Sequence, residues 1–322
     1  MKYSMMIGLL AAAIFSGAAA ADSGNFPQKQ VTIVVPFPAG GTLDVLTRLL
    51  AQNLSKDWKQ AVVVDNKPGA GTMIGTEYVA RSAPDGHTIG MVANSFAINP
   101  ALQENMRYDT ARDFAPVSLL AYAPHVLVAH PGVGVGTLKE VLDKAKAAPG
   151  KLTFASFGSG TSPHLAVERL KAEAEIDVVH VPYKGQAPAL TDLLGGHVQM
   201  MFANLPDVLP YIQSGELKAI AVADSQRADK LPDVPTFAEQ GMADFNSNSW
   251  FGAVVPAKTP DGVVKQLGRD FERVLKLPEV RELLDGRGLQ AVGMTPEDFA
   301  EYLAAEMQSA QALVKSSGAG AN

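Results

Sequence analysis

Residues 31–44 read Val-Thr-Ile-Val-Val-Pro-Phe-Pro-Ala-Gly-Gly-Thr-Leu-Asp, a buried-type strand that runs into a glycine turn and then into a helix. The first backbone N–H groups of a helix have no partner within the helix and carry partial positive charge, so they can hold a carboxylate or phosphate without a cationic side chain. Glycine lets the backbone approach a ligand closely. We therefore predict an anion site at this turn, formed by Phe37, Ala39, Gly40, Gly41, Thr42 and Asp44.

The same order of strand, glycine turn and helix recurs at residues 152–165, which read Leu-Thr-Phe-Ala-Ser-Phe-Gly-Ser-Gly-Thr-Ser-Pro-His-Leu. Hydroxyl groups and glycine amides can donate hydrogen bonds to a carboxylate. Two such loops that face each other would hold an anionic ligand from both sides. The candidate ligand-binding residues of this second loop are Ser156, Gly158, Ser159, Thr161 and His164.

Polar residues also follow other predicted strands, and ligands of open α/β sheets bind outside the carboxyl ends of the strands. Turn formation is an equally good explanation for Asn94, and helix capping is the favoured explanation for Asp207. Lys184, in contrast, is expected to be solvated. The candidates at these positions are Thr72, Asn94, Ser95, Tyr183, Asn204 and Asp207.

The N-terminal segment has the pattern of an export signal, with Lys2 before an apolar core from Met5 to Phe15 and an alanine-rich stretch after it. We expect cleavage near Ala20–Ala21 and no later segment long enough to span a bilayer. The chain has no cysteine, which excludes a cysteine-linked lipid anchor, disulfides and thiolate chemistry. Loss of Lys2 leaves 26 basic against 33 acidic residues, a charge of −7 that offers no basic surface for nucleic acid or anionic membrane.

Short apolar strands alternate with amphipathic helices, which predicts parallel sheets covered by helices and an α/β fold. A mature chain of about 300 residues suggests two domains. Two extended apolar segments differ from this pattern, and we interpret Ala115–Val128 and Asn248–Val255 as a paired hinge between the two units. The predicted strands are Val31–Pro36, Ala61–Asp65, Thr88–Val92, Leu152–Ala155, Val178–Val181, Val198–Phe202 and Leu217–Val222. The predicted helices are Asp44–Lys56, Thr72–Arg81, Leu138–Ala148, Pro163–Ala174 and Ala187–Leu194, with three more ending at Gln213, at Leu275 and near Val314. Ser316–Asn322 is expected to be disordered.

Several kinds of chemistry find weak support in the sequence. The glycines of Asn66–Gly75 are spaced Gly-x-Gly-x-x-x-Gly, which departs from the dinucleotide-binding pattern, and no phosphate-binding P-loop occurs. A nucleophile at Ser159 with His164 as its base lacks the Gly-x-Ser-x-Gly elbow and an acid to orient the imidazole. The six histidines have no metal-ligand spacing. We therefore expect no cofactor and no metal site.

Seven motifs, in order along nearly the whole mature chain, are similar to those of one family, the Bug periplasmic solute-binding proteins, which are receptors of tripartite tricarboxylate transporters. These motifs are PFPAGGTLD (36–44), NKPGAG (66–71), ASFGSGTSPHL (155–165), HVPYKG (180–185), DLLGGHVQMMF (192–202), LPDVPT (231–236) and SWFG (249–252). Each motif alone is weak, whereas their common order is specific.

The resemblance implies a two-lobed type II periplasmic binding fold with a ligand cleft between lobes joined by a two-segment hinge. Lobe 1 would comprise residues 22–121 and 250–322, and lobe 2 residues 122–249, after a signal peptide at 1–21. The resemblance further implies that the loop around Phe37–Asp44 holds one carboxylate through main-chain donors and water, and that the Ser156–His164 loop faces the other end of the ligand. At Ala203, where many members carry Asp, the missing acid argues against an amino-acid ligand.

The function expected from these observations is capture, in the periplasm, of an aliphatic or aromatic mono- or dicarboxylate, which membrane subunits of a tripartite tricarboxylate transporter then take up. A monomer is the default for a diffusing receptor. Two alternatives remain at this point: a ligand-sensing partner of a periplasmic signalling protein, and a periplasmic hydrolase that uses Ser159 and His164.

Overall fold

The computed structural model describes residues 26–103 and 105–317, so the predicted signal peptide lies outside the described residues. The strands are β1 Val31–Val35, β2 Val62–Asn66, β3 Thr88–Ala93, β4 Phe114–Ala129, β5 Thr153–Ser156, β6 Val179–Pro182, β7 Met200–Asn204, β8 Lys218–Val222, β9 Asn248–Pro256 and β10 Gln290–Ala291. The α-helices are α1 Thr42–Trp58, α2 Met73–Ala80, α3 Ser95–Leu102, α4 Leu138–Ala147, α5 Ser162–Ala174, α6 Gln186–Leu194, α7 Leu205–Gln213, α8 Asp261–Leu275, α9 Pro278–Gly286 and α10 Pro296–Ser317.

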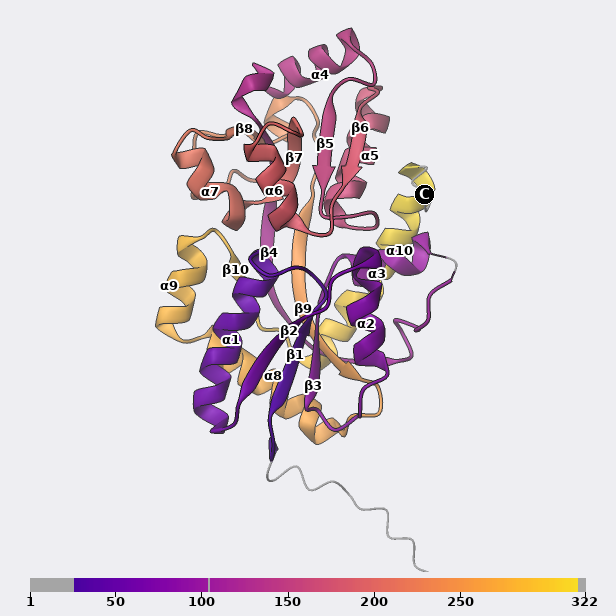
Figure 1. The fold of residues 1–322 in the computed structure, drawn as a ribbon, viewed down its shortest axis with the longest axis vertical. Helices are drawn as coiled ribbons and strands as arrows, with labels where there is room; N and C mark the ends of the chain where they lie inside the picture. Colours follow the sequence, from indigo (N-terminus) through magenta and orange to yellow (C-terminus); the bar gives the residue numbers. More distant parts are fainter. Residues whose placement is uncertain (1–25, 104, 318–322) are drawn as a thin grey trace, which may run out of the picture.

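We call the half of the molecule built on the strand order β2-β1-β3-β9 lobe 1 (Figure 1). The strands β1, β2 and β3 run parallel, and β9 is antiparallel to β3. Side chains alternate between the faces of a strand. Accordingly, Val31 and Ile33 pack with Leu50 of α1 and Phe271 of α8, whereas Val34 belongs to the cluster on the other face. That second cluster includes side chains of α10 and of β9.

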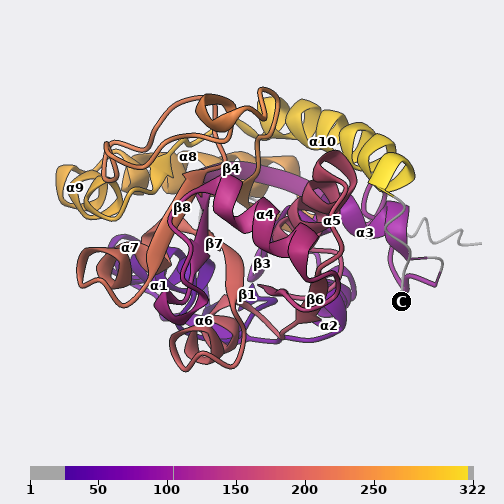
Figure 2. The same cartoon turned by 90° about the horizontal axis from the view of Figure 1, so that it is seen from above.

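Lobe 2 is the half built on β7, β5 and β6, which run parallel in that order, with β8 on β4 beside them. Seen from above, α4 and α5 lie on one side of β7 and α6 on the other (Figure 2). Phe154 and Phe202 point to the α4 and α5 side, and Ala155 and Met201 point to the side of α6 and α7. Because both faces are covered, successive central residues of β5 and β7 are apolar, whereas the edge strand β6 is partly exposed.

The long strand β4 joins the two lobes. Its residues 114–124 pair antiparallel with β9, from Phe114 opposite Pro256 to Pro124 opposite Asn248, and its residues 125–129 pair with β7 and β8. The two segments predicted as a paired hinge are therefore neighbours, and the predicted lobe boundaries fall within β4 and near the start of β9. Their role as a hinge stays a prediction. The C-terminal helix α10 adds a second connection, because it packs against α3 of lobe 1 and α5 of lobe 2.

The structure differs from the sequence-based predictions in three respects. The sheet is mixed rather than parallel, because β9, β4, β8 and β10 are antiparallel to their neighbours. The helices α3 and α9 were not predicted, and α3 contains Pro100, a residue that disfavours helix interiors. The helix α10 runs through Ser317, beyond the predicted start of disorder at Ser316. Within the described residues, no helix has the length and apolar character needed to cross a membrane.

Candidate functional site

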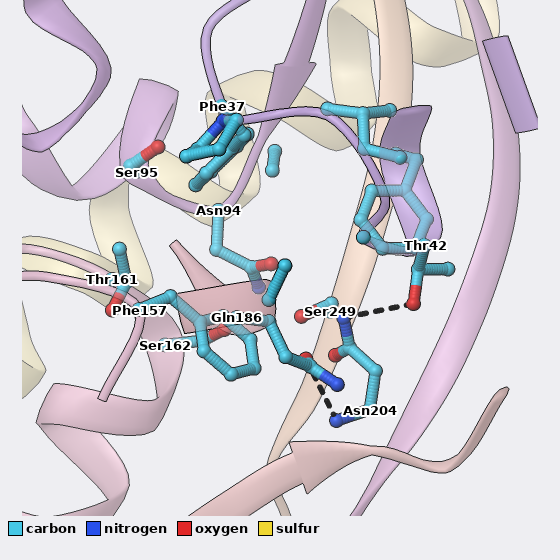
Figure 3. A pocket seen from close by; sticks show the side chains of 16 residues that line it. Phe37, Thr42, Asn94, Ser95, Phe157, Thr161, Ser162, Gln186, Asn204 and Ser249 are labelled. Carbon is cyan, nitrogen blue, oxygen red and sulfur yellow. Dashed lines mark hydrogen bonds between the residues drawn. The ribbon is translucent and has the colours of Figure 1, made fainter. Parts of the chain in front are cut away.

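A pocket with about 470 Å³ of empty space, part of it open to solvent, lies between the two lobes (Figure 3). Lobe 1 contributes the turn after β1, the start of α1, the end of β3 and the start of α3. Lobe 2 contributes the turn after β5, the starts of α5 and α6 and the end of β7, and two residues of β9 complete the lining. None of the lining residues is charged. They are Phe37, Pro38, Gly41, Thr42, Leu43, Ala93, Asn94, Ser95, Phe157, Thr161, Ser162, Gln186, Ala187, Asn204, Ser249 and Phe251.

Five helices begin at this pocket. The first residues of α1, α3, α5 and α6 line it, and α7 begins directly after the lining residue Asn204. Gly41, Asn94, Thr161 and Asn204 are the residues that immediately precede four of these helices. The first turn of a helix carries partial positive charge, and its backbone N–H groups have no partner within the helix. The pocket is therefore suited to an anion although it has no cationic side chain.

Hydrogen bonds across the pocket join the lobes at Thr42. Its Oγ1 donates to Asp207 Oδ2 over 2.6 Å, and its backbone N–H donates to the same oxygen over 3.1 Å. Asn204 Nδ2 donates to Thr42 Oγ1 over 3.2 Å, as Figure 3 shows. Burial raises the pKa of Asp207 to about 6, and the two bonds from Thr42 and the charge of Arg287 lower it only in part. The first N–H of α1 is thus taken by a carboxylate of the protein itself.

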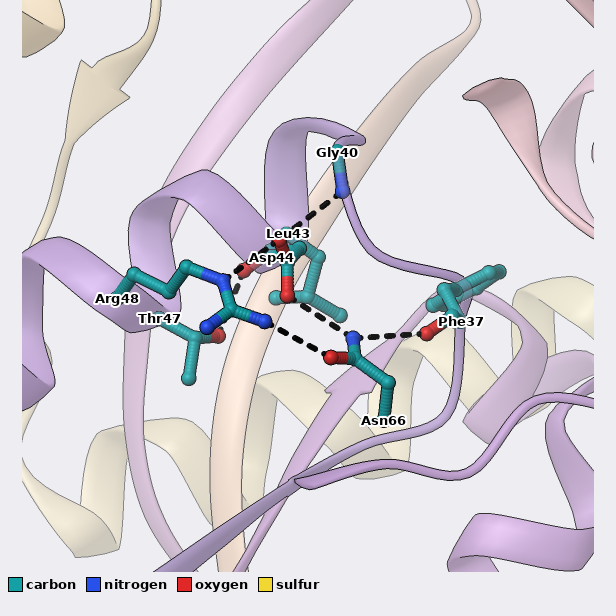
Figure 4. A network of polar contacts seen from close by, with 7 residues as sticks. All are labelled: Phe37, Gly40, Leu43, Asp44, Thr47, Arg48 and Asn66. Carbon is teal, nitrogen blue, oxygen red and sulfur yellow. Dashed lines mark hydrogen bonds and ion pairs between the residues drawn. The ribbon is translucent and has the colours of Figure 1, made fainter. Parts of the chain in front are cut away.

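The turn after β1 is held by Asp44, which does not line the pocket (Figure 4). The buried carboxylate of Asp44 accepts hydrogen bonds from Gly40 N–H (3.0 Å), Arg48 Nε (2.9 Å) and Asn66 Nδ2 (2.9 Å). The same Asn66 amide donates to the carbonyl of Phe37 over 3.1 Å. Burial acts to raise the pKa of Asp44, but these donors and the charge of Arg48 outweigh it and leave the pKa lowered. Asp44 therefore shapes the loop that presents Phe37.

A second hollow adjoins the pocket and shares Phe37 and Phe157 with it. It has about 810 Å³ of empty space, including open solvent, and lies between the Gly69–Met73 turn of lobe 1 and the turns after β5 and β6. The Thr72 hydroxyl also pairs with the Ser95 hydroxyl at 2.9 Å, which links the two spaces. Four predicted residues line this hollow: Thr72, Gly158, Ser159 and Tyr183.

The structure divides the predicted ligand-binding residues into three groups. Those on the pocket are Phe37, Gly41, Thr42, Asn94, Ser95, Thr161 and Asn204, and those on the adjoining hollow are the four just named. The third group lines neither space and comprises Ala39, Gly40, Asp44, Ser156, His164 and Asp207. In this group, Gly40 and Asp44 bond each other, and Asp207 bonds Thr42.

The geometry also bears on the hydrolase alternative. Ser156 is fully buried, and its Oγ lies 2.6 Å from His180 Nε2. His164 Nδ1 accepts a hydrogen bond from Gly160 N–H over 3.3 Å, and its ring stacks on His180. Ser159 lines the adjoining hollow instead of pairing with His164. The predicted pair of Ser159 and His164 is therefore not formed, and Ser156, which contacts His180, is buried away from the pocket.

Sequence reasoning missed several lining residues, among them Gln186 and Ser249. Gln186 opens α6 directly after Gly185, so the strand, glycine turn and helix order that marked the first two loops could have found it. Its Oε1 accepts the backbone N–H of Asn204 over 3.2 Å. Ser249 lies on β9, and its Oγ is 2.9 Å from the ring of the buried His125. No local pattern marks a strand residue of this kind as part of a pocket.

Comparison with known proteins identifies the family. A sequence profile described as "Tripartite tricarboxylate transporter family receptor" matches residues 46–319. The chain belongs to this family. Protein BugT of Bordetella pertussis is 35% identical over 304 residues, which cover 94% of this chain and 93% of BugT. The resemblance inferred from the seven motifs is thereby confirmed.

Solved structures of this receptor family share the fold. The protein Rpa4515 of R. palustris, solved with adipate, has a TM-score of 0.88 and 32% identity, covering 92% of this chain and 99% of the other. MatC from Rhodopseudomonas palustris, solved with bound malate, has a TM-score of 0.86 and 30% identity, covering 90% of this chain and all of MatC (100%). The protein is thus a periplasmic solute-binding receptor of the two-lobed α/β type, as predicted.

Proposed function

We propose that this receptor captures a small organic carboxylate in the pocket between its lobes and presents it to the membrane subunits of a tripartite tricarboxylate transporter. In this proposal the chain is exported to the periplasm, its signal peptide is removed near Ala20–Ala21, and it acts as a monomer without catalysis. The observation that carries the proposal is the convergence of the starts of α3, α5 and α6 on a pocket lined by uncharged residues.

The composition of the pocket supports an aliphatic or aromatic mono- or dicarboxylate. Phe37, Phe157, Phe251 and Leu43 supply apolar surface for a hydrocarbon body, and hydroxyl and amide groups surround it. Pockets of this kind use a few placed polar groups to orient a ligand. The related structures were solved with adipate and with malate, both dicarboxylates, which supports the same chemical class as the ligand proposed here.

A thermal-shift screen of the purified mature chain tests the proposed ligand class. Because a ligand that binds only the native state stabilises it by mass action, a carboxylate at 100 times its Kd should add about 2.7 kcal/mol of stability. The panel would contain mono-, di- and tricarboxylates, aromatic acids, amino acids and sugars. A rise in Tm with one class of carboxylate is expected. A rise with a neutral or cationic solute only would contradict an anion site.

The substitution Gly41→Val tests the pocket itself. Gly41 has an extended backbone (φ −87°, ψ 172°), and a Cβ placed there would meet no atom within 4 Å, so valine adds bulk to the pocket without strain. We expect loss of carboxylate binding with an almost unchanged Tm of the free protein. Gly286→Val is the matched control, because a Cβ at Gly286 also meets nothing within 4 Å and this residue ends α9, outside the pocket. Unchanged binding by Gly41→Val would remove this pocket as the site.

A further inference from the structure

Two histidines and a glutamate come together on lobe 2, behind the loop that contributes Thr161 and Ser162 to the pocket. His164 and Glu168 lie one turn apart on α5, and His180 lies on β6. One potential metal-ligating atom from each of the three side chains lies within 4.8 Å of the other two. The imidazole rings stack with centroids 4.3 Å apart and planes inclined by 28°. None of these three residues lines the pocket.

This geometry points to a transition-metal site, and we propose that His164, Glu168 and His180 bind a Zn²⁺ ion. Two imidazoles and one carboxylate form a common set of protein ligands for zinc and leave a fourth position for water. With Zn–N bonds of about 2.0–2.1 Å and a tetrahedral angle, the two ring centroids would lie about 5 Å apart. The observed separation is 4.3 Å, and because a metal lies in the plane of each imidazole that binds it, the two stacked rings must both move apart and rotate to bind one ion.

The atoms around the cluster leave one nitrogen of each ring for the metal. Ser156 Oγ contacts Nε2 of His180 at 2.6 Å, so Nδ1 of His180 is the ring atom left to coordinate. A serine hydroxyl can accept as well as donate, and it can therefore hold the tautomer that a metal requires. In His164 the Gly160 N–H donates to Nδ1 over 3.3 Å, so Nε2 is the ring atom left to coordinate the metal. Coordination through Nε2 places the ring proton on Nδ1, so this long contact is given up.

Charge at the cluster also favours the ion. The Glu168 carboxylate pairs with Lys171 Nζ at 2.9 Å. Zn²⁺ would displace Lys171, whose side chain is 30% exposed, so its ammonium group can turn to solvent. The site is thus occupied by a weak, partly exposed ion pair that a divalent cation can replace.

Isothermal titration of the metal-free mature protein, prepared without a histidine tag, with Zn²⁺ tests the proposal. We expect one equivalent to bind and the affinity to fall about 10-fold or more in Glu168→Gln and in His180→Ala. His197→Ala is the matched control, because His197 is exposed and outside the cluster, and it should bind zinc as the wild type does. Glu168→Gln changes a partly exposed helix residue, so it decides the outcome should His180→Ala fail to fold.

Loading with Co²⁺ provides a second, independent measurement. A tetrahedral site with two imidazoles gives strong visible absorption bands, and these should be absent in His180→Ala or, if that variant does not fold, in Glu168→Gln. The proposal is overturned if the wild type binds no zinc, if Glu168→Gln and a folded His180→Ala bind it as tightly as the wild type does, or if the cobalt protein shows only the weak bands of an octahedral ion.

Discussion

Asp44 in α1 and Asp207, which contacts the start of α1 from α7, have pKa values displaced in opposite directions. The stability of their amide variants should therefore respond oppositely to pH. Asp207 reaches Thr42 from lobe 2, and burial raises its pKa from the ordinary 3.8 to about 6. The native protein then keeps this proton up to a higher pH than the unfolded chain does. Its stability accordingly falls as the pH rises from about 4 to 6, because the native state holds more protons in that window.

The size of this stability change follows from the displacement of the pKa of Asp207. A change of pKa from 3.8 to about 6 corresponds to about 3 kcal/mol of unfavourable free energy for the ionised form at pH 7. This value is an upper limit, because separation of the lobes would return the carboxylate to water. Asparagine carries no charge and can still accept hydrogen bonds from Thr42. The stability of Asp207→Asn relative to the wild type should therefore increase by up to about 3 kcal/mol between pH 4 and pH 7.

Asp44→Asn provides the control with the opposite sign. The pKa of Asp44 is lowered although burial acts to raise it, because Arg48, Gly40 and Asn66 donate to the ionised carboxylate. Its stabilising contribution is present above the pKa of about 4 that an aspartate has in an unfolded chain, and it is lost as the pH falls through the lower native value. Asp44→Asn should be less stable than the wild type at pH 7, and this deficit should shrink at acidic pH.

Urea unfolding followed by tryptophan fluorescence, in steps from pH 3 to pH 8, measures both differences in one series. Subtraction of the wild-type curve removes the titration of all other groups, as long as the two variants have the same fold. A stability difference for Asp207→Asn that does not change between pH 4 and pH 7 would refute the reasoning. It would mean that the carboxylate of Asp207 is solvated and that Thr42 does not bond it in solution.

Three further predictions concern the pocket and its supports. Raising the salt concentration should weaken carboxylate binding only modestly, because the donors are backbone amides and hydroxyls within the protein; a steep loss in titration calorimetry would indicate lysines instead. Thr42→Val should weaken carboxylate binding about 10-fold or more, because it removes the hydroxyl that bonds Asp207 and holds the two lobes together. The liganded variant should then be less compact than the liganded wild type, and equal compactness of the two in X-ray scattering would contradict this. Gly252→Ala should destabilise the protein by about 1–3 kcal/mol, because the new Cβ would meet the ring of Phe299, and Gly286→Ala should not; equal urea midpoints would show that this packing relaxes.

The parts of the fold that were predicted correctly depend on patterns within short stretches of chain. The strand, glycine turn and helix at residues 31–44 is one such pattern, and the structure places β1 and α1 there. The second, at residues 152–165, gives β5 and α5. Because both turns lie at the carboxyl ends of strands, the sequence could place them near a ligand cleft before any contact was known.

The parts that were not predicted depend on contacts between distant residues. The favoured prediction that Asp207 caps its own helix was wrong, because Asp207 bonds Thr42 across 165 positions of the chain and α7 has no side-chain cap. Local sequence could not distinguish these two arrangements. His164 and His180 are 16 positions apart on a helix and a strand, and only the packing of α5 on lobe 2 brings their rings together. The helix α3 forms despite Pro100, because its residues Phe96 and Ile98 are buried against neighbouring elements.

The position of Asp207 also changes the expected orientation of the ligand. The resemblance implied that main-chain donors of the Phe37–Asp44 loop hold a carboxylate, yet Gly40 N–H donates to Asp44 and Thr42 N–H donates to Asp207. Two negative groups already lie at the start of α1, and a third anion there would be repelled. The starts of α3, α5 and α6 carry no such carboxylate among the lining residues. We therefore expect the ligand carboxylate to lie toward Ser95, Ser162 and Gln186, and the apolar body of the ligand to face Phe37 and Leu43.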